Sequence, residues 1–222
     1  MLLRFFDICF STAALLILSP LLLLVVIILR LTGEGEIFFF QERVGLKGEL
    51  FKLFKFATML KNSPTIGTGT VTLHNDPRIL PFGSFLRKSK INELPQLINV
   101  LKGEMSIIGP RPQTARCFKA FPHSCQLEIL KVLPGLSGIG SIIFRNEEKM
   151  LLSKNDADEF YDNSIMPYKG VLEAWYVQKQ SISSYFILIF LTVWVVLGLN
   201  KRAAWLVFRD LPKPPSDLKV WI

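Results

Sequence analysis

The chain has 222 residues, which allows one ordinary domain with or without membrane elements. Half of its residues are hydrophobic, the net charge is +8, and the apolar residues concentrate towards the two ends. A basic chain of this kind suits an anionic partner. The sequence contains no helix-turn-helix, zinc-finger or RNA-binding aromatic motif, so we expect a membrane surface or phosphorylated substrates and no nucleic acid. The three cysteines form no CxxC pair and no even disulfide set, which predicts reduced thiols.

The stretch between Asp7 and Arg30 carries no charge and is long enough to span a bilayer. Ser19-Pro20 lies in its middle. A proline there cannot donate to the carbonyl of Leu16, so the helix should kink or break. This leaves two membrane alternatives: a kinked spanning helix, or a re-entrant helix with both ends on one face. A buried core helix is the third alternative.

Two short apolar or alternating runs, at 38–40 and 50–59, are separated by Gly45 and Gly48. They predict the strands of a hairpin with its turn at 46–48. The following segment, 62–74, is rich in Gly, Thr, Ser and Pro and predicts a loop. It contains neither a P-loop nor a Rossmann fingerprint.

Leu94, Leu97, Ile98 and Leu101 have the spacing of one apolar helix face. Asn92 is a suitable N-cap for this helix, and Gly103 a suitable residue just after its end. Glu93 is then expected in the first turn, where the helix dipole favours its ionised form and attracts phosphate.

Segments in the second half of the chain predict mostly helix. Residues 116–132 read as a helical region broken by Pro122, residues 133–148 as a Gly-rich turn leading into a short strand, and residues 156–161 and 171–177 as helices. The apolar run 185–199 is short for a membrane span and ends near basic and tryptophan residues, so it is expected to lie in the membrane interface or to form a core helix. The proline-rich tail from Leu211 is expected to be loose.

Five motifs occur in an order that resembles a known family. They are the Ser19-Pro20 pair in the apolar helix, FFFQERVGLKGELFKLFKF (38–56), NDPRILPFGSFLRK (75–88), ELPQLINVLKGEMSIIGPRP (93–112) and LPGLSGIG (133–140). The chain is similar in these motifs to the bacterial sugar transferases, the small monotopic phosphoglycosyl transferases. The likeness covers most of residues 1–145 and continues more weakly to about residue 199.

The resemblance implies a mixed α/β fold, mostly α. A small membrane-associated catalytic domain, 34–183, follows a re-entrant membrane helix, 1–33, and precedes an interfacial amphipathic helix and tail, 184–222. It implies transfer of a sugar phosphate from a UDP-sugar to polyprenyl (undecaprenyl) phosphate with release of UMP, which starts surface glycan assembly. It further implies Mg²⁺ as cofactor and a catalytic domain on the cytosolic face of the bacterial inner membrane. A homo-oligomer is left open.

The family's site residues carry over by motif. The family has an Asp-Glu pair before LPQL, with Asp as nucleophile; here Glu93 matches, as metal and phosphate organiser, but the nucleophile position is Asn92. Ala57 stands where the family has an arginine. The substrate-binding positions that match are Lys55, Arg87, Arg111 and, less closely, Arg145.

These residues also have plain structural alternatives. Glu93 is otherwise an ordinary first-turn carboxylate, Arg111 a turn residue held between Pro110 and Pro112, and Lys55 and Arg87 surface charges. Phosphoryl transfer depends mainly on positioning and charge neutralisation, which the retained charges suit. The loss of the Asp leaves a second hypothesis, a catalytically silent relative that binds polyprenyl phosphate or a partner of the glycan pathway at the membrane.

Overall fold

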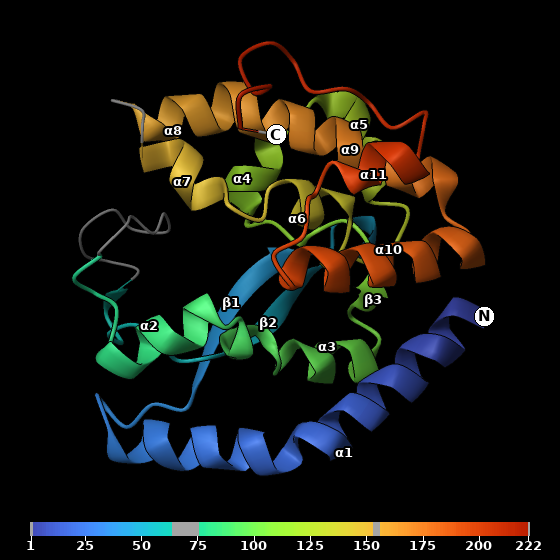
Figure 1. The fold of residues 1–222 in the computed structure, drawn as a ribbon. Helices are drawn as coiled ribbons and strands as arrows, with labels where there is room; N and C mark the ends of the chain where they lie inside the picture. The colour runs from blue at the N-terminus through green and yellow to red at the C-terminus, as the bar shows by residue number, and fades with distance from the viewer. Residues whose placement is uncertain (1, 64–75, 153–155, 222) are drawn as a thin grey trace.

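The computed structural model describes residues 2–63, 76–152 and 156–221, so most of the loop predicted at 62–74 lies outside the described residues. The fold is mostly helical with two small sheets, which confirms the predicted class (Figure 1). The helices are α1 (Leu2–Leu31), α2 (Pro81–Lys88), α3 (Gln96–Lys102), α4 (Ala115–Lys119), α5 (His123–Ile129), α6 (Ile139–Ile143), α7 (Glu147–Leu152), α8 (Ala157–Phe160), α9 (Met166–Lys179), α10 (Ile182–Val196) and α11 (Ala203–Val207). The strands are β1 (Phe38–Val44), β2 (Leu50–Phe56), β3 (Ser106–Ile108) and β4 (Gly135–Ser137).

Helix α1 runs through Pro20 without interruption and bends in its middle (Figure 1). The proline leaves the carbonyl of Leu16 without its usual amide donor. The hydroxyl of Ser19 donates to that carbonyl at 2.8 Å, which satisfies it inside the apolar segment. The predicted kink is therefore confirmed, and the Ser-Pro pair keeps the bent helix continuous.

The first turns of α1 dock onto the rest of the chain. The guanidinium of Arg4 donates to main-chain carbonyls at the end of α3. Asp7 is buried, and one of its oxygens accepts from the Ser106 hydroxyl at 3.0 Å, the Ile107 amide at 2.9 Å and the Tyr185 hydroxyl at 2.8 Å. A carboxylate with three donors is a strong anchor, because a buried charge without partners would be costly. Asp7 thus ties α1 to β3 and α10.

The last turns of α1 dock onto the same body through apolar packing. Val25 and Leu29 are buried against Phe56 of β2 and Leu86 of α2. Between the two docked ends, the middle of α1 exposes large apolar side chains, including Leu16, Ile17, Leu21, Leu23 and Leu24. Among the described residues α1 is also the helix that is long and apolar enough to cross a membrane.

The two sheets are small and differ in direction. Strands β1 and β2 form the predicted antiparallel hairpin, with Phe38 opposite Phe56. Strands β3 and β4 pair in parallel, with Ser106 opposite Gly135. A side chain at Gly135 would place its Cβ 2.1 Å from the Gly109 amide nitrogen. Glycine is therefore required where the main chains following β3 and entering β4 touch.

The main hydrophobic core lies between α6, α9 and α10. Fully buried side chains at its centre include Ile143, Leu172, Tyr176 and Leu188. Helix α10 buries one face in this core and exposes apolar side chains such as Phe190 on the other. The core alternative for this segment is therefore confirmed for one face, and its place in a membrane interface stays a prediction.

Two expectations for the second half of the chain are wrong. The apolar residues after the Gly-rich turn form α6, and the strand in this region is the earlier β4, because a short buried apolar run suits either helix or strand. The proline-rich tail is not loose. Leu211 and Leu218 bury their side chains in the main core, and Lys201 donates to the carbonyl of Trp221 at 2.8 Å.

Candidate active site

An ion pair between Glu93 and Arg111 forms the centre of the candidate site. Nη2 of Arg111 donates to Oε1 of Glu93 at 2.6 Å, across 18 residues of sequence. The two side chains keep 29% and 16% of their surface exposed, so a ligand can reach both. Burial by itself raises the pKa of Glu93, but Arg111 and Lys55 outweigh it and hold this pKa well below the usual range of a carboxyl group. Glu93 is therefore ionised at neutral pH.

The helix start differs from the sequence prediction. Residues Ile91–Glu93 form a 3₁₀ turn, and α3 begins only at Gln96 with Pro95 as its N-cap. Asn92 therefore does not cap α3, and Glu93 does not lie in its first turn; the cations around Glu93, and not the helix dipole, favour its charge. Asn92 is 7% exposed, and its Oδ1 has no hydrogen-bond partner among the described residues. The predicted end of α3 at Gly103, with φ of 86°, is confirmed.

The turn that carries Arg111 is fixed by its main chain. Gly135 donates to the carbonyl of Pro110 at 2.8 Å, and the Arg111 amide donates to Oε1 of Glu173 at 3.1 Å. Glu173 is fully buried on α9, and this burial raises its pKa to about 7 despite the donors around it. A side chain at Gly140 would place its Cβ 2.3 Å from Oε1 of Glu173. Glu173, which the sequence interpretation missed, thus holds the turn that carries Arg111 in place, and the absence of a side chain at Gly140 leaves room for its carboxylate.

Lys55 of β2 lies within electrostatic range of Glu93 and of three arginines. Burial is the main cause that lowers the pKa of Lys55 to about 7; Glu93 opposes this shift, and Arg43, Arg111 and Arg87 contribute to it. An ammonium in this setting loses its proton near neutral pH, unlike an ordinary lysine. Lys55 is thus the cation of this site whose charge is poised to change on ligand binding.

Arg43 of β1 belongs to the same group and was not singled out from the sequence. Its guanidinium donates to Gln41 Oε1 at 2.6 Å and to the carbonyl of Pro112 at 3.3 Å. Burial and the nearby Arg111 lower its pKa to about 10, so it stays charged at neutral pH. The sequence offers one signal that could have led to Arg43: alternate residues of a strand share a face, so Arg43 lies on the same face of β1 as Phe39 and Gln41.

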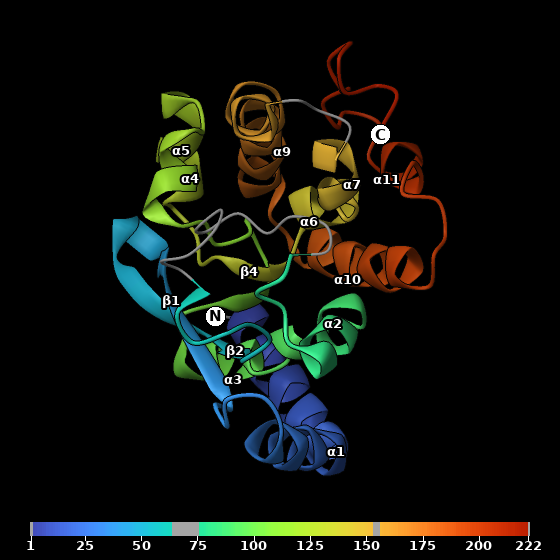
Figure 2. The same ribbon diagram turned by 90° about the vertical axis from the view of Figure 1, so that its left-hand side faces the viewer.

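We call Lys55, Arg43, Arg87 and Arg111 the cation cluster. Arg87 enters it from the last turn of α2, since it is close enough to lower the pKa of Lys55. Arg145 follows α6 and is half-buried; no interaction described for Glu93 or Lys55 includes it, so its substrate role stays a prediction. Figure 2 shows β1 and α4 at one side of this region and α2 and α7 at the other.

A magnesium ion needs hard oxygen ligands. In the described parts of the chain, no three His, Cys, Asp or Glu side chains gather as a metal site. Beside Glu93, the partnerless Oδ1 of Asn92 is a second oxygen donor, while Lys55 and Arg111 repel a dication. These residues fit Mg²⁺ only together with a diphosphate, whose oxygens complete the coordination and whose charge offsets the cations.

The sequence comparisons agree with this geometry. The family model described as bacterial sugar transferase matches residues 1–199, which include α1, the cation cluster and α10. The chain belongs to this family. The two docked ends of α1 and the Glu93–Arg111 site are thus features of a family member.

Named relatives are similar over most of the chain. An exopolysaccharide production protein, ExoY of Sinorhizobium fredii, is 37% identical over 158 residues, 65% of this chain and 70% of the relative. A UDP-glucose:undecaprenyl-phosphate glucose-1-phosphate transferase of Escherichia coli is 33% identical over 203 residues, 90% of this chain but 40% of the relative. An undecaprenyl-phosphate glucose phosphotransferase of Komagataeibacter xylinus is 34% identical over 195 residues, 86% of this chain and 35% of the relative. This chain therefore spans less than half the length of the last two.

Proposed function

We propose that this protein transfers a sugar phosphate from a UDP-sugar to polyprenyl phosphate at a membrane surface, releases UMP and so begins the assembly of a surface glycan. The observation that carries the proposal is the Glu93–Arg111 pair inside the cation cluster, next to an apolar helix docked at both ends. The printed names of two relatives, which join undecaprenyl phosphate to glucose or glucose 1-phosphate, support the substrate classes.

The docking of α1 supports a re-entrant membrane helix. Arg4 and Asp7 fix its start, and Val25 and Leu29 fix its end, to one packed domain. A domain cannot lie on both faces of a bilayer, so both ends belong on the same face. The exposed apolar middle then enters the hydrocarbon, where the Ser19 hydroxyl keeps the backbone satisfied at the bend. In a bacterium this face would be the cytosolic one of the inner membrane, where nucleotide sugars are available.

The cation cluster can hold two phosphate-bearing substrates against their mutual repulsion. The guanidinium of Arg111 uses Nη2 for Glu93, and its remaining N–H groups can contact a diphosphate in a planar, two-point manner. Lys55 and Arg43, which lie on the β1–β2 hairpin, add positive charge to the site. Glu93 and Asn92 would hold Mg²⁺ together with the diphosphate, and the ion would supply further neutralisation of charge.

Asn92 indicates a direct transfer. An amide is a very poor nucleophile towards phosphorus, whereas the acceptor phosphate already carries an anionic oxygen. That oxygen can attack the phosphorus that bears the sugar; the new P–O bond forms as the P–O bond to UMP breaks, and the electron pair leaves with UMP. Arg111 and Lys55 stabilise the charge on the departing phosphate, so no proton transfer is needed in this step.

The decisive experiment is UMP release from a panel of UDP-sugars by the full chain in lipid nanodiscs with polyprenyl phosphate and Mg²⁺. We expect release with one or a few sugars, and we expect Glu93→Gln to abolish it, because the neutral amide neither pairs with Arg111 nor binds Mg²⁺ as well. Glu128 lies on α5 and pairs at the surface with Lys131, so Glu128→Gln is a control that leaves the site intact. No release with any sugar would favour the silent, lipid-binding relative instead.

A further inference from the structure

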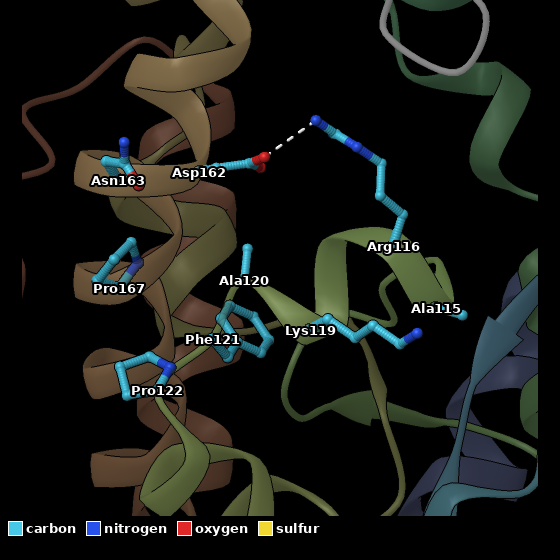
Figure 3. A pocket seen from close by; sticks show the side chains of 9 residues that line it. All are labelled: Ala115, Arg116, Lys119, Ala120, Phe121, Pro122, Asp162, Asn163 and Pro167. Atoms are coloured by element: carbon cyan, nitrogen blue, oxygen red, sulfur yellow. Dashed lines mark hydrogen bonds and ion pairs between the residues drawn. The ribbon is translucent and has the colours of Figure 1, made fainter.

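An open cavity of about 780 Å³ lies between α4 and the π-helical turn Tyr161–Ile165 (Figure 3). Its volume is in the range of pockets that bind small molecules. Its walls carry both polar and apolar groups: Arg116, Lys119, Asp162 and Asn163 among the polar ones, and Phe121 with two prolines among the apolar ones. Such a mixture suits a ligand that combines a flat ring with hydroxyl groups.

The polar groups of this cavity have unused bonding capacity. Nη2 of Arg116 donates to Oδ2 of Asp162 at 3.0 Å, and the pair spans the cavity in Figure 3. The side chain of Asp162 is 36% exposed although its Oδ1 is buried, so Oδ2 is the oxygen that a ligand can reach, and it can accept a second hydrogen bond. Lys119 is exposed at the rim, and its ammonium forms no ion pair with the residues that the structure describes. A ligand that donates to Asp162 and accepts from the two cations would use these groups.

The cavity lies beside the cation cluster. Cys117 follows Arg116 on α4, and Tyr161 precedes Asp162 in the π-helical turn. Cys117 and Tyr161 pack against the same apolar cluster, and both lie within electrostatic range of Arg43. The same two elements thus border the cavity on one side and the cation cluster on the other. π-Helical turns are rare and occur often at functional sites.

We infer that this cavity receives the nucleoside half of the nucleotide-sugar donor, while the cation cluster holds its diphosphate. The inference rests on the proposed function. Asp162 is an acceptor for the ribose hydroxyls, a role that carboxylates fill in other nucleotide sites. Arg116 and Lys119 donate to the carbonyl oxygens of the pyrimidine, and its flat ring lies against the apolar wall formed by Phe121 and the prolines.

The test measures binding of UDP, and separately of the UDP-sugar that turns over best, to the full chain in nanodiscs by calorimetry. Asp162→Asn keeps the shape of the side chain, and Ala120→Trp fills the cavity without changing its charge. Lys119→Ala, at an exposed position, keeps the test informative where Ala120→Trp fails to fold. Glu128→Gln on the neighbouring α5 is the matched control.

We expect Asp162→Asn to weaken UDP and UDP-sugar alike by about tenfold or more, the value of a hydrogen bond to a charged group. Lys119→Ala should weaken both in the same direction, Ala120→Trp should abolish binding, and Glu128→Gln should match the wild type. Variants that are folded but bind UDP as tightly as the wild type would overturn the inference and leave the proposed function standing. A loss confined to the UDP-sugar would assign the cavity to the hexose and also overturn it. A wild-type protein that binds no uridine nucleotide would instead refute the proposed function itself.

Discussion

Replacing Arg111 by lysine tests whether the guanidinium joins the carboxylate of Glu93 to the diphosphate. Nη2 of Arg111 lies 2.6 Å from Oε1 of Glu93, and the side chain is 29% exposed. A guanidinium in this position can hold the carboxylate with one nitrogen and phosphate oxygens with the other N–H groups. Lysine keeps the charge but concentrates it on one flexible ammonium, which cannot reproduce the planar two-point contact.

The expected loss is that of one charge-assisted hydrogen bond. Such a bond contributes about 1.5–3 kcal/mol, which corresponds to a fall of about 10–150-fold in kcat/KM. The fold should tolerate the change, because Glu173 holds this turn through the main-chain amide of Arg111 at 3.1 Å and not through the side chain. The melting temperature of the variant should therefore stay close to that of the wild type.

The assay is the initial rate of UMP release in nanodiscs, measured for wild type and Arg111→Lys across a range of donor concentrations. Arg209→Lys, at an exposed arginine near the C-terminus, makes the same chemical change away from the site. If Arg111→Lys turns over like the wild type, the arginine is a simple point charge or a structural residue, and the two-point contact is refuted.

Four further predictions follow from the same geometry. Donor affinity should fall as pH rises through about 7, because Lys55 loses its proton there, and calorimetry should detect proton uptake on binding that Lys55→Gln removes. The raised pKa of Glu173 should make the free energy of unfolding decrease as pH rises from about 4.5 to about 7 and level off above, and denaturation of Glu173→Gln should lack this slope. If Asn92 forms no covalent intermediate and the transfer is direct, initial-rate kinetics should be sequential, and incubation with labelled UDP-sugar alone should leave no label on the protein. An isolated phosphosugar adduct would contradict direct transfer. Pro20→Ala should straighten α1 and move its start across the bilayer, which labelling of a cysteine at position 2 would report; labelling of otherwise wild-type protein from the far side would exclude the re-entrant helix.

Local patterns in the sequence determine much of the architecture. The uncharged run with Pro20 is enough to predict a long, bent apolar helix, because a proline inside a helix removes a donor wherever it occurs. Gly45 and Gly48 mark the hairpin turn, and Gly103 ends α3, since turns and helix ends depend on backbone conformations that glycine adopts easily. The order of motifs, from Ser19-Pro20 to the Gly-rich run at 133–140, is also enough to identify the family before any contact is known.

The tertiary structure decides which charges meet and what each of them does. Glu93 owes its ionised state to Arg111 and Lys55, which come from distant segments, and not to the start of α3, where the sequence placed it. The sequence interpretation did not include Arg43 and Glu173 in the site, because the residues next to a charge in a strand or helix do not show which distant residues it will contact. Burial, desolvation and ion pairing depend on how distant segments pack, and no spacing along the chain specifies that.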